Sequence, residues 1–232
     1  MGRITYYGHA AFLVEVGGAR VLIDPWISNP LSPVKPSDVA EQADYIVLTH
    51  SHSDHVGDTE EIMVLNERAK LVAIYELAVH MARRVGEKRV IAANIGGVVR
   101  LGDIRLVFTE ALHSSDYGSP AGVVIISEEA RVYHAGDTGV TMNMRLVGEL
   151  YKPDIALLPI GGHFTMGPLE AAKAVELLRP KVAIPMHYKT FPVLEGTPEE
   201  FRKLVEEKCL PTKVVVLSPG EQYEFDFRLG VY

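Results

Sequence analysis

The sequence predicts an α/β protein that forms one domain over residues 1–232 and folds as a four-layer αββα sandwich with an internal pseudo-duplication. Three observations predict this class. A chain of 232 residues suits one large domain or two tightly joined halves, at about 100–200 residues per domain. Each half begins with strands and continues as alternating strands and helices. Short sequence segments also recur between the halves. Two such halves bury their sheets against each other and keep their helices outside.

The recurring words lie at a nearly constant spacing. The paired segments are Ala19–Asp24 with Ala130–Ala135, Asp44–Leu48 with Asp154–Leu158, and Val72–Ile74 with Val182–Ile184. Their offsets are 111, 110 and 110 residues. One short apolar match arises easily by chance, but three matches at almost the same offset indicate duplication of a unit of strands and helices.

The first half opens on a hairpin signal. Ala11–Val16 and Arg20–Ile23 are apolar or β-branched runs on either side of a Gly-Gly turn. Residues 27–42 are rich in Pro and Ser and predict a surface loop, whereas Tyr45–Leu48 predicts a short buried strand. The remaining predicted elements are a helix near Asp58–Arg68, a strand at Leu71–Ile74, a helix at Glu76–Val85, and strands at Val98–Leu101 and Ile104–Glu110.

The second half repeats this order. Strands are predicted at residues 122–127, 131–135, 155–159, 182–185, 213–217 and 222–227, with helices at 142–151, 168–178 and 198–208. Pro168 at the start of one helix and Pro180 just after its end stand where proline is compatible with a helix boundary.

Composition excludes several classes of protein. Apolar residues make up 47% of the chain and charged residues 23%, so the chain can bury a core and is not disordered. A net charge of −7 argues against non-specific nucleic-acid binding, which depends on Lys and Arg. No apolar run reaches the ~18–20 residues that span a bilayer, and the first residues do not read as a secretory signal. The single Cys209 cannot form an internal disulfide. We expect a cytoplasmic protein that acts on a small molecule, without nucleic acid or membrane, and a homo-oligomer is compatible with this composition.

Three histidines and one aspartate lie within six residues, directly after the predicted strand that ends at Leu48. They are His50, His52, Asp54 and His55. In an extended segment positions 50 and 52 project alike, and the next two residues can turn the other way, so the cluster can serve two adjacent metal ions. Imidazole and carboxylate ligands suit Zn²⁺, Fe²⁺ or Mn²⁺.

Further ligand types follow other predicted strands. His113 follows Ile104–Glu110, Asp137 follows the strand at 131–135, and His187 follows the strand at 182–185. Because sites in α/β proteins form beyond the carboxyl ends of strands, we expect these side chains to join the first cluster.

The sequence around these residues resembles that of the metallo-β-lactamase superfamily, in its metal-dependent hydrolase branch related to L-ascorbate-6-phosphate lactonase. The segments that carry the resemblance are Gly8-His9, Asp24-Pro25, Thr49 to His55, Gly136-Asp137-Thr138, Pro159 to Met166 and Pro185 to Tyr188. They span nearly the whole chain. The fold of that superfamily is the αββα sandwich, in agreement with the duplication.

The resemblance implies a division of the ligands between two metals. His50, His52 and His113 would hold one ion, Asp54, His55 and His187 would hold the other, and Asp137 would bridge them. His52 stands where flavodiiron-type oxygen reductases of the superfamily carry Glu, which favours hydrolysis over redox chemistry.

We therefore predict a dinuclear metal-dependent hydrolase that uses a metal-bridging hydroxide on a small ester, lactone or phosphorylated metabolite. Zn²⁺ is the expected ion, and Mn²⁺ or Ni²⁺ also suit the ligands. A phosphodiesterase or nuclease of the same fold and a non-catalytic metal-binding protein are the alternatives. Asp54 and His163 are the candidate catalytic residues, although a metal-bound Asp54 is not a free base.

Three more residues are candidates for holding a ligand or touching substrate. Asp24 ends a strand and can orient a ligand histidine, or it simply forms the turn before Pro25. His9 begins the predicted hairpin, and Lys189 is a candidate contact for an anion. For His134 we expect either burial or a contact to a metal ligand, and for His80 a position at the surface.

Overall fold

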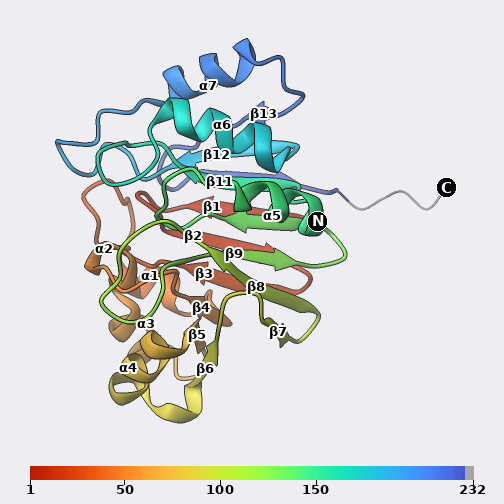
Figure 1. The fold of residues 1–232 in the computed structure, drawn as a ribbon. Coiled ribbons are helices and arrows are strands. Elements are labelled where there is room, and N and C mark those ends of the chain that lie inside the picture. Colours follow the sequence, from red (N-terminus) through yellow and green to blue (C-terminus); the bar gives the residue numbers. More distant parts are fainter. Residues whose placement is uncertain (228–232) are drawn as a thin grey trace.

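The computed structural model describes residues 1–227 and has four layers, in the order helices, sheet, sheet, helices (Figure 1). In this view, helices α1 to α4 gather at the left and lower left, and helices α6 and α7 lie at the top, with α5 just below them. The predicted αββα sandwich is confirmed.

The first sheet has seven strands, and its first four are antiparallel and its last four parallel. In spatial order they are β14 (Gln222–Phe225), β1 (Gly2–Tyr6), β2 (Phe12–Val16), β3 (Ala19–Ile23), β4 (Tyr45–Val47), β5 (Lys70–Ile74) and β6 (Val90–Ala93). The predicted hairpin is therefore β2 and β3.

The second sheet has the same plan. Its strands in spatial order are β7 (Val98–Leu101), β8 (Ile104–Glu110), β9 (Ala121–Ile126), β10 (Arg131–His134), β11 (Ile155–Pro159), β12 (Val182–Met186) and β13 (Lys213–Val214). The first four are antiparallel, and β10 to β13 are parallel.

Helices cover the outer face of each sheet. Over the first sheet lie α1 (Pro36–Ala40), α2 (Ser53–Val56), α3 (Thr59–Leu65), α4 (Tyr75–Val85) and the 3₁₀ turn η1 (Glu87–Arg89), and over the second lie α5 (Asn143–Tyr151), α6 (Pro168–Leu178) and α7 (Pro198–Glu207). None of the helices among residues 1–227 is long and apolar enough to cross a bilayer.

Alternation along the strands supplies three apolar layers. In β2, Phe12 and Val14 face the second sheet, whereas Leu13 packs with the helices. In β11, Leu157 faces the first sheet and Leu158 packs under the helices. The two sheets thus bury one common core between them, and each half keeps a separate core beneath its own helices.

The duplication is visible in hydrogen bonds. The backbone N–H of Arg20 donates to Asp44 Oδ2 over 3.0 Å, and that of Arg131 donates to Asp154 Oδ2 over 2.9 Å. The third of the three repeated segments, which aligned Val72 with Val182, is wrong by two residues. Val47 pairs with Val72 in the first sheet, and its counterpart Leu157 pairs with Ile184 in the second, so Val72 corresponds to Ile184. The first two pairings agree with this register.

Several elements differ from the sequence prediction. The sequence pattern did not predict β1 and β6 as separate strands. Each forms by pairing with a neighbour, β1 with β2 and β6 with β5. Helix α1 lies inside the predicted loop and begins at Pro36, the position where proline fits a helix. Helix α3 ends at Leu65 rather than near residue 68, because Asn66 leaves the helix and its side chain binds the carbonyls of Ala40 and Ala43. Strand β13 pairs over two residues only, and β14 ends at Phe225.

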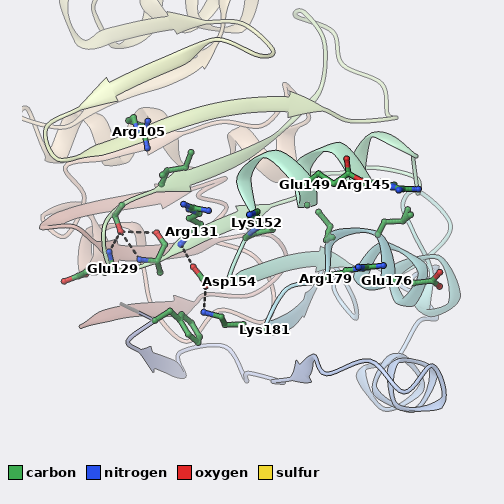
Figure 2. A pocket seen from close by; sticks show the side chains of 18 of the residues that line it. Arg105, Glu129, Arg131, Arg145, Glu149, Lys152, Asp154, Glu176, Arg179 and Lys181 are labelled. Carbon is green, nitrogen blue, oxygen red and sulfur yellow. Dashed lines mark hydrogen bonds and ion pairs between the residues drawn. The ribbon is translucent and has the colours of Figure 1, made fainter. Parts of the chain in front are cut away.

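A groove of about 1220 Å³ lies at the amino ends of β10, β11 and β12 (Figure 2). Arg131, Asp154 and Lys181 line it, and Lys181 pairs with Asp154 over 2.8 Å. The histidine cluster instead follows the carboxyl end of β4, so this groove and the candidate metal residues lie at opposite edges of the sheets.

Candidate metal centre

The candidate ligands meet at the carboxyl edge of both sheets. His50 to His55 follow β4, His113 follows β8, Asp137 follows β10, and His187 follows β12. Helix α2 begins at Ser53, with His52 as its N-terminal flanking residue. Asp54 and His55 join a different group of ligand atoms from His50 and His52, although the rings of His50 and His55 lie only 4.1 Å apart.

One group of ligand atoms comes from His50, His52, His113 and Asp137, whose ligand atoms lie within 4.8 Å of one another. The Nε2 atom of His50 lies 3.0 Å from Nδ1 of His52, which in turn lies 3.3 Å from Nε2 of His113. Three ring nitrogens that face one another at these distances form a set typical of a divalent-metal site.

A second group comes from His9, Asp54, His55 and His187, with ligand atoms again within 4.8 Å. The Oδ2 atom of Asp54 lies 4.0 Å from His55 Nε2, 3.8 Å from His187 Nε2 and 2.9 Å from His9 Nε2. This is the predicted second set, with His9 added.

Asp137 lies between the two groups. Its Oδ1 is 3.2 Å from His55 Nε2, and its Oδ2 is 3.0 Å from His187 Nε2 and 3.5 Å from His113 Nε2. One carboxylate therefore reaches ligand nitrogens of both groups, which is the geometry that a bridging ligand requires.

Several of these atoms are buried without a hydrogen-bond partner. Among the described residues they include Nε2 of His55, Oδ1 of Asp137, and both ring nitrogens of His187. Buried polar atoms are nearly always satisfied, so unsatisfied nitrogens that face a carboxylate need another partner. Because imidazole and carboxylate are the ligands that Zn²⁺, Mn²⁺ and Ni²⁺ accept, these residues fit bound metal ions.

Asp24 and Thr49 determine the tautomers of two ligand rings. Asp24 is fully buried and accepts hydrogen bonds from Thr49 N over 2.8 Å, from Thr49 Oγ1 over 2.6 Å and from His55 Nδ1 over 2.7 Å. Since its hydroxyl donates to Asp24, Thr49 accepts from His50 Nδ1 over 3.0 Å. In the neutral form of each ring, the proton is therefore on Nδ1, and Nε2 is unprotonated and directed at the site.

His9 is held in the same way from the other side. Its Nε2 donates to Asp54 Oδ2 over 2.9 Å, because a carboxylate accepts, and its Nδ1 accepts from Thr190 Oγ1 over 2.6 Å. The backbone carbonyl of His9 also accepts from His187 N over 2.8 Å. His9 thus ties Asp54 of the first half to the loop that carries His187.

The electrostatics differ between the rings, because burial dominates at His9, His50 and His113 and the neighbouring carboxylates dominate at His55. Burial lowers the pKa of His9 to about 4, and burial also lowers the pKa of His50 and of His113 below the usual value. Burial raises the pKa of Asp137, but His55 and His187 outweigh it and hold that pKa well below its usual range. For His55, burial lowers the pKa, and Asp137 and Asp24 more than reverse the effect.

Several candidate residues have a left-handed backbone, which non-glycine residues seldom adopt. The φ angles are 53° for His9, 45° for Asp24, 58° for His163, 56° for His187 and 63° for Lys189. Such conformations cost about 1–3 kcal/mol each and concentrate at functional sites. The chain therefore accepts strain where it leaves the strands.

Besides Asp24, two candidate residues lie outside both groups of ligand atoms. His163 is exposed, with its ring 4.5 Å from that of Phe164. Its loop is tethered beside the site, because Met166 N donates to Thr138 O over 2.9 Å. Lys189 is exposed, with its ammonium 5.8 Å from the ring of Tyr188.

The two remaining histidines have structural surroundings. His134 is fully buried, donates from Nε2 to Ala10 O over 2.9 Å and accepts from Gly136 N over 3.1 Å. His80 is half-buried and stacks on Tyr117 with ring centroids 3.8 Å apart.

Sequence reasoning missed the threonines and the aromatic rings beside the site. Thr49 and Thr190 each hold a histidine, and Trp26 and Phe191 contact the ring of His9. Their only signal was position, because each lies next to, or a few residues after, a candidate residue in the chain.

Known proteins resemble this chain along most of its length. A family model described as a beta-lactamase superfamily domain matches residues 19–188. A UPF0173 metal-dependent hydrolase of Aeropyrum pernix is 62% identical over 241 residues, with 98% of this chain and 99% of that protein covered. A protein of the same description from Hyperthermus butylicus is 55% identical over 229 residues, with 97% and 100% covered.

Solved structures give the same result. A metallo hydrolase of the archaeon Ignicoccus hospitalis is 45% identical and superimposes with a TM-score of 0.90, over 97% of this chain and 99% of that one. An isothiocyanate hydrolase from Delia radicum gut bacteria is 19% identical with a TM-score of 0.79, over 97% and 99% of the chains. At that identity the likeness concerns the fold alone.

Proposed function

Because the chain belongs to the beta-lactamase superfamily and is a metal-dependent hydrolase, we propose that it is dinuclear and acts on a small ester, lactone or phosphorylated metabolite. One observation supports this proposal above the others. Asp137, a member of one group of candidate ligand atoms, also lies 3.2 Å from His55 and 3.0 Å from His187 of the other group, and several of these atoms are buried with no hydrogen-bond partner among the described residues.

In the proposed centre, His50, His52 and His113 hold one ion, Asp54, His55 and His187 hold the other, and Asp137 bridges them. Zn²⁺ is the ion we propose, with Mn²⁺ or Ni²⁺ as alternatives that suit the same ligands. When bound, two such ions supply Lewis acidity and activate water for attack on a carbonyl or phosphorus.

The side chains of this chain supply the orientation. Asp24 and Thr49 keep His55 and His50 in the tautomers that ligation needs. His9 donates to Oδ2 of Asp54, the oxygen that lies 3.8 Å from His187 Nε2, and so holds this carboxylate toward the second group of ligand atoms. His9 itself is then a positioning residue rather than a ligand, because its Nε2 carries a proton.

Proton transfer to the leaving group is simplest for a residue that is not a ligand, because a metal-bound carboxylate is a weaker base. We propose His163 for this role, since its loop is tethered next to Asp137 and its ring is exposed. The partly exposed Asp54, with 19% of its side chain accessible, is the other candidate.

Lys189 is proposed as a contact for an anionic substrate. The place of action that we propose is the cytoplasm, because a lone exposed cysteine, Cys209, suits a reducing compartment.

The proposal is tested with protein loaded in turn with Zn²⁺, Mn²⁺ and Ni²⁺ and offered lactones, esters, thioesters and phosphodiesters. We expect two ions per chain by elemental analysis and turnover of at least one class. Asp137→Ala should lose metal and activity, and Asp103→Ala, at an exposed turn, should lose neither. A limit of one ion per chain with every ligand intact would refute the dinuclear centre, and preferred turnover of phosphodiesters would favour the phosphodiesterase alternative.

A further inference from the structure

We propose that Trp26 and Phe191, called here the aromatic pair, form a binding site beside the metal centre for a planar apolar group of the substrate, such as an aryl ring. This inference rests on the proposed function and adds a substrate class to it. Neither residue belongs to the candidate ligands.

The aromatic pair lies one ring away from the ligands. The rings of Trp26 and Phe191 stack with centroids 5.7 Å apart and an interplanar angle of 21°. Both meet the ring of His9 edge-on, at 5.0 Å and 5.5 Å. The His9 ring is itself 3.9 Å from that of His187 and hydrogen-bonded to Asp54. A group that rests on the pair therefore lies within one side chain of the proposed metal ligands.

The pair is assembled from both halves of the duplicated fold. Trp26 follows Asp24 by two residues in the loop after β3, and Phe191 follows His187 by four residues in the loop after β12. Each ring is therefore brought to the site by the same strand end that carries a site residue.

The backbone at both rings is held in place. A Cβ at Gly57 would lie 2.4 Å from the Cα of Trp26, so the turn after α2 packs directly on the Trp26 backbone. Asp58 N donates to Pro25 O over 2.9 Å. Beside the other ring, Thr190 is fixed by its hydroxyl contact with His9. A pre-positioned surface of this kind lowers the entropy cost of ligand binding.

Both rings keep surface open to solvent, whereas His9 beneath them is fully buried. The pair thus offers partly exposed aromatic surface next to buried ligand residues. A planar apolar group close to the scissile bond, as in an aryl ester or an aryl phosphate, matches this surface.

The test compares two probes that share a head group and are not hydrolysed. Phenylphosphonate and methylphosphonate both offer an anionic head to the zinc-loaded protein, and only the first carries a ring. We expect phenylphosphonate to bind about 2- to 12-fold more tightly by calorimetry, the range that corresponds to an aromatic contact. Trp26 is the single tryptophan of the chain, so its fluorescence should change more with the phenyl probe than with the methyl probe.

Variants locate the effect. Trp26→Ala and Phe191→Ala should remove the phenyl advantage and leave methylphosphonate binding within about two-fold, whereas Trp26→Phe should keep most of it. Leu150→Ala, at an exposed apolar residue of α5, is the matched control and should change neither affinity. Phe191→Leu, which keeps apolar bulk beneath the indole, replaces Phe191→Ala if circular dichroism shows that the alanine variant is unfolded.

The outcomes separate this inference from the function on which it rests. Equal affinities for the two phosphonates in the wild type, or a phenyl advantage that survives Trp26→Ala, would overturn the aromatic pair as a binding site while the metal centre stands. Failure of both probes to bind a protein shown to hold zinc would overturn the proposed anion-binding centre and the pair together.

Discussion

Replacing Asp24 with asparagine separates a role in metal binding from a role in the turn. Asparagine has nearly the same shape, tolerates the φ of 45° at this position and forms the same kind of turn before proline. It differs in hydrogen bonding. Asp24 accepts hydrogen bonds from Thr49 N, Thr49 Oγ1 and His55 Nδ1. An asparagine whose Oδ1 accepts from Thr49 N directs its NH₂ group at Thr49 Oγ1 and His55 Nδ1, where it can only donate.

The consequence falls on one ligand ring. To accept from the amide, His55 must move its proton from Nδ1 to Nε2, where it points at Asp137 Oδ1, 3.2 Å away. The lone pair that a metal ion needs is then lost. Partners that orient ligand rings contribute about 10- to 100-fold in metal affinity, or about 1.4–2.7 kcal/mol. We expect Asp24→Asn to weaken one of the two ions by this factor and to leave the other near its wild-type affinity.

Competition with a chelator, together with elemental analysis of the same samples, measures both affinities. The matched control is Asp44→Asn. Like Asp24, Asp44 accepts a hydrogen bond from a backbone N–H, that of Arg20, but it lies at the opposite edge of the sheet. Wild-type affinity for both ions in a folded Asp24→Asn protein would refute the tautomer argument and leave Asp24 as a turn residue.

Three further predictions concern the same region. Asp137→Ala should lose bound metal and activity together, whereas His163→Ala should keep its metal and lose turnover by up to about 10²–10⁴-fold; loss of metal from the second variant, measured by elemental analysis, would make His163 a ligand. Burial lowers the pKa of His9 to about 4 in the folded protein, against about 6.5 for an ordinary histidine. The unfolded chain therefore takes up a proton first, and the stability of the metal-free protein should be full above pH 6.5 and fall between pH 6.5 and 4. This residue accounts for about 3 kcal/mol of that fall, and urea unfolding at both pH values should show a smaller fall for His9→Asn; an unchanged pH dependence would contradict the assignment. Gly57→Ala combines a φ of 45° with a Cβ placed 2.4 Å from Trp26 Cα, so thermal unfolding should show a loss of at least about 1–3 kcal/mol, and a melting temperature equal to that of the wild type would show that the loop yields freely.

Much of the architecture could be predicted from local patterns. The Gly17-Gly18 turn between two apolar runs predicted the β2–β3 hairpin, and Pro168 marked the first residue of α6. The cluster from His50 to His55 indicated a metal site, because three His and one Asp within six residues are far from background composition. These signals are short in range, and nearest neighbours in the chain determine them.

Other features were decided by tertiary structure. Strand β6 forms because it pairs with β5. The repeated segment at Val182 is displaced by two residues, because the register of β12 follows its pairing with β11 rather than the similarity of the two sequences. Both effects involve partners that lie far away in the sequence, so a local pattern does not contain them.

The same holds for the chemistry of the site. The types of ligand could be read from the sequence, but the contact of His9 with Thr190 joins residues 181 positions apart, and the stacking of Trp26 on Phe191 joins the two halves of the duplication. The protonated nitrogen of each ring depends on which hydroxyl or carboxylate meets its other nitrogen in space. Residue types are a property of the chain, whereas tautomer, strain and burial arise only when the ends of distant strands are brought to one edge.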